Sequence, residues 1–263
     1  MRLAVSIAYD GTCFHGSARQ PGMATVEGSI IDRLIAMEAI ESAEAGRFQA
    51  ASRTDAGVSA AGNVVAFDTE MRPDSVVNGL AYGLEDVWPL RYAVVDDDFT
   101  PRHARRKTYR YYLYDEGYDW KAMQQAAHFF EGMHDFSAFA RLDGRSPLRS
   151  IERVILNGGE VLTIDVTGSS FLWQQVRRMV AAVIQVGRGD LSVMVIQEAL
   201  QHPAGQDFGL ASSEQLLLLA VEYPDTPAWR KAPGVEKLKE RLHSLQARRH
   251  MYADMTHSAH RNK

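Results

Sequence analysis

The sequence of 263 residues is 46% apolar and 24% charged, with a formal net charge of −4. These proportions are typical of a soluble globular protein, and no apolar run reaches the roughly 20 residues of a membrane span. The N-terminal stretch turns polar too early for a signal peptide, so we expect a cytoplasmic protein without a membrane partner. The single cysteine, Cys13, excludes an internal disulfide framework and a cysteine cluster for zinc.

The first part of the chain predicts a strand, a helix and two further strands. Residues 2–9 (RLAVSIAY) alternate as in a half-buried strand. Thr25 is expected to cap a helix whose apolar face carries Val26, Ile30, Leu34 and Met37. Short strands are expected at 47–52 and 63–68.

A similar order of elements returns after Pro101. The expected strands are 108–114, 151–157, 161–167 and 216–223, and the expected helices are 119–131, 170–187 (capped by Ser169 or Ser170) and 192–201. Because the strands cluster in hairpins instead of alternating singly with helices, we predict an α+β fold of two related halves with antiparallel sheets. We place one domain at 1–104, a second at 105–226 and a tail at 227–263.

The tail predicts a basic amphipathic helix over 235–250. Val235, Leu238, Leu242 and Leu245 recur at helical spacing among lysines and arginines. We expect this helix to pack against the body, with an RNA or membrane-surface contact as the alternative. The last stretch, up to Lys263, is expected to be disordered.

The segment RTDAG at 53–57 is expected to form a tight loop that carries Asp55. A carboxylate here could be a nucleophile, a base or a metal ligand, or simply a turn aspartate that satisfies nearby amides. A metal site is the weakest chemical option, because the chain lacks HExxH and EF-hand spacings. Phosphate-binding glycine motifs and a GxSxG elbow are also absent from the sequence.

Helix geometry singles out Arg177. It shares a face with Trp173, Val180, Ala181 and Ile184, whereas Arg178 lies beside glutamines. A guanidinium on an apolar face is costly without an acceptor, so we predict that Arg177 pairs with a carboxylate or with backbone carbonyls.

Tyrosines alternate along the expected strand 108–114. Tyr109 and Tyr111 should face one side, and Tyr112 and Tyr114 the other. Such residues usually belong to the core, but a tyrosine at a cleft could stack on a base or transfer a proton. Spacing does not choose between Tyr109 and Tyr111.

Basic residues are concentrated in the segment RHARRKTYR at 102–110, which has no acidic residue, and recur at Arg141, Arg145, Arg149 and Arg153. A solvated surface is the ordinary explanation for such runs. Phosphate binding is the alternative, since it depends on local rather than net charge.

Five segments, in this order along the chain, resemble the tRNA pseudouridine synthase family typified by TruA. They are YDGTCFHGSARQPGMATVEG at 9–28, ASRTDAGVSAAGNVVAF at 51–67, KTYRYYLYD at 107–115, GMHDFSAFA at 132–140 and FLWQQVRRMVAAVIQVGRG at 171–189. The resemblance implies two α/β halves around a central RNA-binding cleft. It also implies a homodimer that isomerises uridine to pseudouridine in tRNA without cofactor or metal.

The resemblance assigns roles to particular residues. Asp55 would be the nucleophile, Tyr109 the active-site tyrosine and Arg177 the partner of the aspartate. The residues expected to bind RNA or the flipped nucleotide are Gln20, Arg53, Thr54, Arg102, Arg105, Arg106, Lys107 and Arg110. The usual family target is uridine 38 to 40 of the anticodon arm. The alternatives are the same reaction at other tRNA uridines, a non-catalytic tRNA-binding or tRNA-folding protein and, more remotely, a metal-dependent nuclease.

Overall fold

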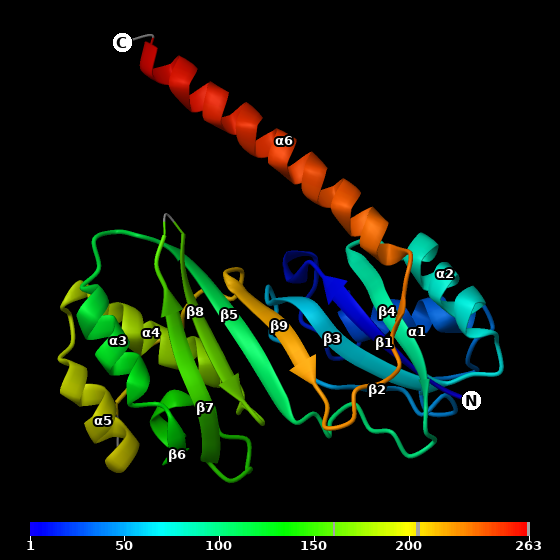
Figure 1. The fold of residues 1–263 in the computed structure, drawn as a ribbon, viewed down its shortest axis with the longest axis horizontal. Coiled ribbons are helices and arrows are strands. Elements are labelled where there is room, and N and C mark those ends of the chain that lie inside the picture. Colours follow the sequence, from blue (N-terminus) through cyan, green and yellow to red (C-terminus); the bar gives the residue numbers. More distant parts are fainter. Residues whose placement is uncertain (160, 204–205, 262–263) are drawn as a thin grey trace.

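A single ten-stranded sheet runs through the molecule (Figure 1). The computed structural model describes residues 1–159, 161–203 and 206–261. The strands are β1 (Arg2–Tyr9), β2 (Gln49–Ala50), β3 (Ser59–Asp68), β4 (Val87–Val95), β5 (Arg106–Tyr114), β6 (Gly132–Asp135), β7 (Leu148–Asn157), β8 (Val161–Gly168), β9 (Leu216–Glu222) and β10 (Arg230–Lys231). Their order is β10-β4-β1-β3-β9-β5-β8-β7-β6, and β2 pairs with β3.

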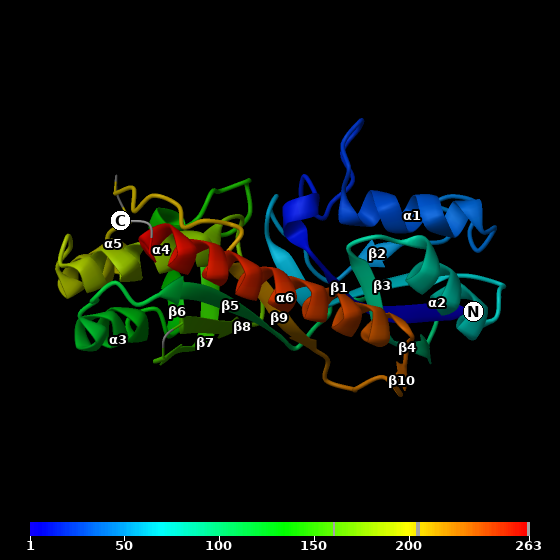
Figure 2. The same ribbon diagram turned by 90° about the horizontal axis from the view of Figure 1, so that it is seen from above.

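Helices accompany each part of the sheet. They are α1 (Val26–Ala36), α2 (Pro73–Gly83), α3 (Trp120–His128), α4 (Gln175–Arg188), α5 (Val193–Gln201) and α6 (Gly234–Arg261). Seen from above, α1, α4 and α5 lie on the same side of the sheet (Figure 2). Within the described residues, no helix has the length and apolar character needed to cross a membrane.

The expected α+β fold with two halves is confirmed, and the halves meet at one parallel strand pair. β3 and β9 pair in parallel through Ser59↔Leu217 and Ala60↔Leu218. The other strand pairs among the described residues are antiparallel. Two sheets therefore join edge to edge into one. The boundaries at 104 and 226 remain a prediction, since the sheet is continuous and β10 returns to β4 of the first half.

Side-chain caps fix the starts of three helices where they were expected. Thr25 Oγ1 accepts from the Gly28 N–H at 3.2 Å, and an Asp119 carboxylate oxygen accepts from the Ala122 N–H at 2.9 Å. Ser192 Oγ similarly accepts from the Met194 N–H. Such caps satisfy amides that have no partner within the helix.

The sequence did not predict α2 and β4. Helix α2 starts with Pro73, which suits a first helical position, and buries Val76, Val77 and Leu80. Strand β4 contains Pro89, which normally disfavours a strand interior. Here the register between β1 and β4 shifts beside the Ile7↔Pro89 pair, so an irregularity accommodates the missing N–H.

Helix α4 starts five residues later than expected. Its N-cap is Gln174, in the left-handed region with φ 62°, and not Ser169 or Ser170. Before it, Arg141 and Trp173 form an isolated antiparallel bridge. This bridge keeps the chain extended where we expected a helical turn.

Helix α6 packs against the body only over its first turns. Lys237 lies over the Tyr82 ring at 4.6 Å, and Arg241 pairs with Asp86 at 3.5 Å. Beyond this point Leu242 and Leu245 are exposed and the helix projects from the body (Figure 1). The expectation that the helix over 235–250 packs against the body was therefore correct only in part. The helix continues to Arg261, where we expected disorder, because no glycine or proline interrupts it after Gly234. Residues 262–263 lie outside the described part.

Candidate active site

A cavity of about 730 Å³ lies where the two halves of the sheet meet. The first half contributes the loop that carries Asp55. The second contributes β5 and the start of α4. The residues that line it include Arg53, Thr54, Asp55, Arg102, Lys107, Tyr109, Trp173 and Arg177. Residues far apart in the sequence thus converge on one hollow, as expected for a binding site.

Asp55 and Arg177 form an ion pair across this cavity. Arg177 Nη1 donates to Asp55 Oδ2 at 3.0 Å, and the two side chains are 13% and 23% exposed. Arg177 Nε also donates to the carbonyl of Ala211 at 2.8 Å, which fixes the guanidinium. The predicted acceptor of Arg177 is therefore a carboxylate from the other half of the molecule. The Asp55 carboxylate held in this way is still within reach of a ligand.

A buried polar network holds the loop before Asp55. The Thr54 N–H donates to Ser17 Oγ at 2.7 Å, and the Thr54 hydroxyl lies 2.8 Å from the Tyr9 hydroxyl. Asn63 Nδ2 donates to the Ser52 carbonyl, and Asn63 Oδ1 accepts from the Ser52 N–H. These side chains are almost fully buried, so each polar group depends on its partner. The network fixes the backbone that presents Asp55.

Glycines allow the loop to turn tightly around Asp55. Gly57 has φ +85°, and the Val58 N–H returns to the Asp55 carbonyl at 3.1 Å. Gly16 has φ +100°, and a Cβ there would lie 3.2 Å from the Thr54 carbonyl oxygen. Larger residues would be strained at both positions.

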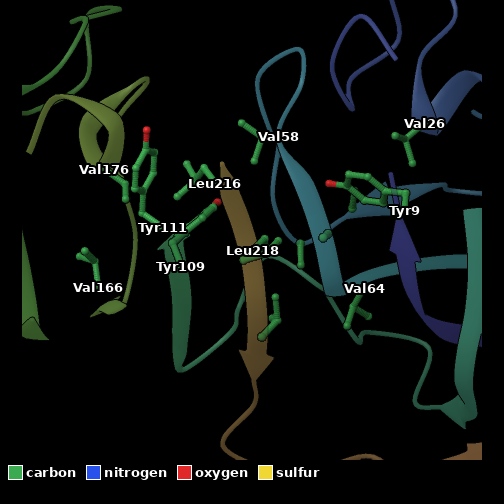
Figure 3. Close-up of a cluster of buried hydrophobic side chains, with 14 of the residues drawn as sticks. Tyr9, Val26, Val58, Val64, Tyr109, Tyr111, Val166, Val176, Leu216 and Leu218 are labelled. Carbon is green, nitrogen blue, oxygen red and sulfur yellow. The ribbon is translucent and has the colours of Figure 1, made fainter. Parts of the chain in front are cut away.

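Strand β5 places Tyr109 in the cavity. Tyr109 and Tyr111 are buried, whereas Tyr114 on the other face is 60% exposed, as the alternation predicted. Figure 3 shows both buried tyrosines near Val176 and Leu216. Tyr109 packs edge-on against Phe171, whereas the Tyr111 hydroxyl donates to Gln215 and faces a separate cavity. The structure therefore distinguishes the two candidates. Burial, with a smaller effect from the nearby Asp55, raises the pKa of Tyr109 to about 12, so its phenol is neutral near pH 7.

Further cations border the cavity, among them Lys107 and Arg102. Lys107 Nζ donates to the Ala51 carbonyl at 2.6 Å. Burial, assisted by the neighbouring Arg102, lowers the pKa of Lys107 to about 8. With Arg53, these residues give the cavity a positive rim that suits an anionic ligand.

Comparison with known proteins identifies the family. The family model for tRNA pseudouridine synthase matches residues 126–224. The tRNA pseudouridine synthase A of Thermococcus kodakarensis is 46% identical over 243 residues, covering 91% of each chain. That of Pyrococcus horikoshii is 41% identical over 97% of this chain and 99% of its own. This chain belongs to the tRNA pseudouridine synthase A family. A solved Cbf5-Nop10-Gar1 complex aligns with 12% identity and a TM-score of only 0.33, over 74% of this chain and 44% of that one. The assignment to the tRNA pseudouridine synthase A family therefore rests on the sequence relatives.

Four of the basic and polar residues expected to bind RNA lie outside the cavity. Arg106 and Arg110 occupy the opposite face of β5 from Tyr109. Arg110 makes two bonds of 2.7 Å to Asp165, and Arg106 pairs with Glu152 and Glu222. Arg105 and Gln20 are exposed and, in the part of the chain described, are not among the lining residues. The run 102–110 therefore does not face the cavity as a whole, because a strand sends alternate side chains to opposite faces.

Two parts of the site were not predicted from the sequence. Trp173 donates its indole N–H to Asp55 Oδ1 at 3.1 Å, but the sequence indicated only that it shares a helix face with Arg177. The second part is the support from Asn63 and Ser17. The available sequence signal for Asn63 was its position in the otherwise apolar run NVVAF at 63–67.

One group of possible metal ligands lies outside the cavity. Asp10, Cys13 and Asp86 place one ligand atom each within 4.8 Å of one another. Partial burial and the bond to Asp86 raise the pKa of the Cys13 thiol.

Proposed function

We propose that this tRNA pseudouridine synthase isomerises uridine at positions 38 to 40 of the tRNA anticodon arm, with Asp55 as the nucleophile. Activity on tRNA uridine follows from the family. The position and the nucleophile are our proposals. The observation that supports the nucleophile is the Asp55–Arg177 pair, which spans the two halves inside a cavity.

The pair suits nucleophilic catalysis because it places a cation beside a carboxylate that stays accessible. Asp55 is 23% exposed, and each carboxylate oxygen has lone pairs beyond those used by its donors. A target base inside a tRNA stem must first leave its stack, and the cavity offers space and an aromatic wall for it.

The reaction requires one bond to break and another to form. The bond between C1′ and N1 of uridine breaks, the base turns, and C1′ joins C5. Asp55 could attack either the sugar at C1′ or the base at C6, and its carboxylate is regenerated in both routes. The C5 proton leaves and N1 gains one, so the net change is an isomerisation.

Tyr109, which lines the cavity, is our candidate for moving that proton. A phenol with a pKa near 12 is seldom a phenolate at neutral pH, so it is a poor base by itself. We propose that its oxygen accepts the C5 proton while its own proton departs toward N1. Such a relay needs no charged intermediate on the tyrosine.

Phosphates of the RNA would meet the positive rim formed by Arg53, Arg102 and Lys107. We further propose the homodimer that the family resemblance implies, with each tRNA touching both subunits. Light scattering on the purified protein tests this second proposal, because a dimer doubles the 29.3 kDa mass of the chain.

Transcripts of tRNA labelled with tritium at uridine C5 test the main proposal. Wild-type protein should release tritium, and Asp55→Asn should bind the tRNA but release none. Transcripts with cytidine at positions 38 to 40 should release none with either protein. Release by Asp55→Asn would refute the nucleophile, and release from the cytidine transcripts would indicate another target uridine. Binding without release by the wild type would favour a tRNA-binding or tRNA-folding protein.

A further inference from the structure

Trp173 holds the second oxygen of the Asp55 carboxylate. Its indole Nε1 donates to Oδ1 at 3.1 Å, while Arg177 Nη1 donates to Oδ2 at 3.0 Å. Arg177 makes one bond to the carboxylate and not a two-pronged one, so by itself it would leave the carboxylate plane free to turn. A donor on each oxygen fixes that plane.

The Trp173 ring is held in place although it is 41% exposed. The Arg141 guanidinium lies 4.3 Å from the ring centroid, and the Arg141 N–H donates to the Trp173 carbonyl at 2.9 Å. The next residue, Gln174, adopts φ 62°, which a non-glycine residue avoids unless its surroundings require it. A cation on its face, a backbone bridge and a strained neighbour thus orient an indole that burial alone would not fix.

We propose that Trp173 is a positioning residue for the nucleophile, an inference that rests on the proposed role of Asp55. Its N–H sets the carboxylate plane without changing the charge of the Asp55–Arg177 pair. Losing this N–H should slow the chemical step and leave tRNA affinity unchanged, because the bond acts on the carboxylate and not on the RNA.

Two replacements separate the N–H from the ring. Trp173→Phe keeps an aromatic ring and removes the donor, whereas Trp173→His keeps a ring N–H. A hydrogen bond to a charged group is stronger than one between neutral groups, but the exposure of Trp173 limits its effect. We expect a roughly tenfold fall in the single-turnover rate of tritium release at saturating tRNA for Trp173→Phe. The Kd for tRNA should stay within about twofold, and Trp173→His should recover most of the rate.

Trp229→Phe is the matched control. Arg91 lies 4.7 Å from the centroid of the Trp229 ring, but this tryptophan is outside the residues that line the cavity. The single-turnover rate of tritium release by Trp229→Phe should equal that of the wild type.

The outcomes distinguish this inference from the function on which it rests. A normal rate for Trp173→Phe, or an equal loss for Trp173→His, overturns the positioning role. A change in tRNA affinity without a change in rate also overturns it, because the ring would then be an RNA contact. Asp55→Asn, measured alongside, reports on the nucleophile, and release by that variant refutes the proposed role of Asp55 on which this inference rests.

Discussion

The strength of the Asp55–Arg177 pair is measurable by a double-mutant cycle. The variants are Asp55→Asn, which keeps the shape of the side chain, Arg177→Met, which keeps an apolar stem, and their combination. The contact is 3.0 Å between side chains that are 23% and 13% exposed. At an effective dielectric constant near 20, two charges at this distance attract by about 5.5 kcal/mol. Desolvation offsets much of this attraction, so we expect a net coupling of about 2 kcal/mol.

Urea unfolding of the four proteins gives this coupling directly from differences in the free energy of unfolding. Arg177→Met should be the most destabilised, since it leaves a carboxylate without its cation, and adding Asp55→Asn should restore part of the loss. The neighbouring Arg178–Asp207 pair is the control. Its contact is 2.8 Å, but Asp207 is 74% exposed, so we expect at most about 0.5 kcal/mol. Equal coupling for the two pairs would refute the argument from burial.

Three further predictions concern the loop and the positive rim. Gly57→Ala should cost about 1 to 2 kcal/mol of unfolding free energy and slow tritium release, because φ is +85° and the new Cβ would lie 2.6 Å from Ser213 Oγ; wild-type stability and rate would contradict it. Lys107, with its pKa lowered to about 8 by burial, loses its charge as the pH rises through 8. Filter binding should therefore show tRNA affinity falling from pH 7 to 9.5, and Lys107→Arg should not show this fall; parallel curves would exclude Lys107 from the interface. Arg102→Gln should flatten the slope of log affinity against log salt by about one unit, whereas Arg106→Gln, on the opposite face, should not; equal slopes for the two variants would refute this distinction.

Helices with a local start signal were predictable from the sequence. Thr25, Asp119 and Ser192 cap α1, α3 and α5 by bonds to amides within the next three residues, and such bonds need no distant partner. Strand β4 and the start of α4 depend on distant contacts. Pro89 is tolerated through the register of β1, and Trp173 stays extended by pairing with Arg141. The residues themselves do not carry this information.

The candidate site also combines features set by local sequence with features set by distant contacts. The alternation of β5 predicted that Tyr109 and Tyr111 share a face, and helix spacing predicted that Arg177 needs an acceptor. That acceptor lies 122 residues away, and only the family resemblance indicated it before the structure placed the two together. The alternation that located Tyr109 also puts Arg106 and Arg110 on the far face, a consequence that the basic run 102–110 concealed.

The parallel contact between β3 and β9 has a further consequence. It is made by backbone groups at two register pairs, Ser59↔Leu217 and Ala60↔Leu218. Side chains support this pairing, because Ala60 and Leu218 are buried in the core and Ser59 Oγ accepts from the Gly11 N–H at 3.0 Å. A one-residue slip would shift the whole first half by about 3.3 Å relative to the second and separate Asp55 from Arg177. The distance between Asp55 and Arg177 thus depends on the register between β3 and β9.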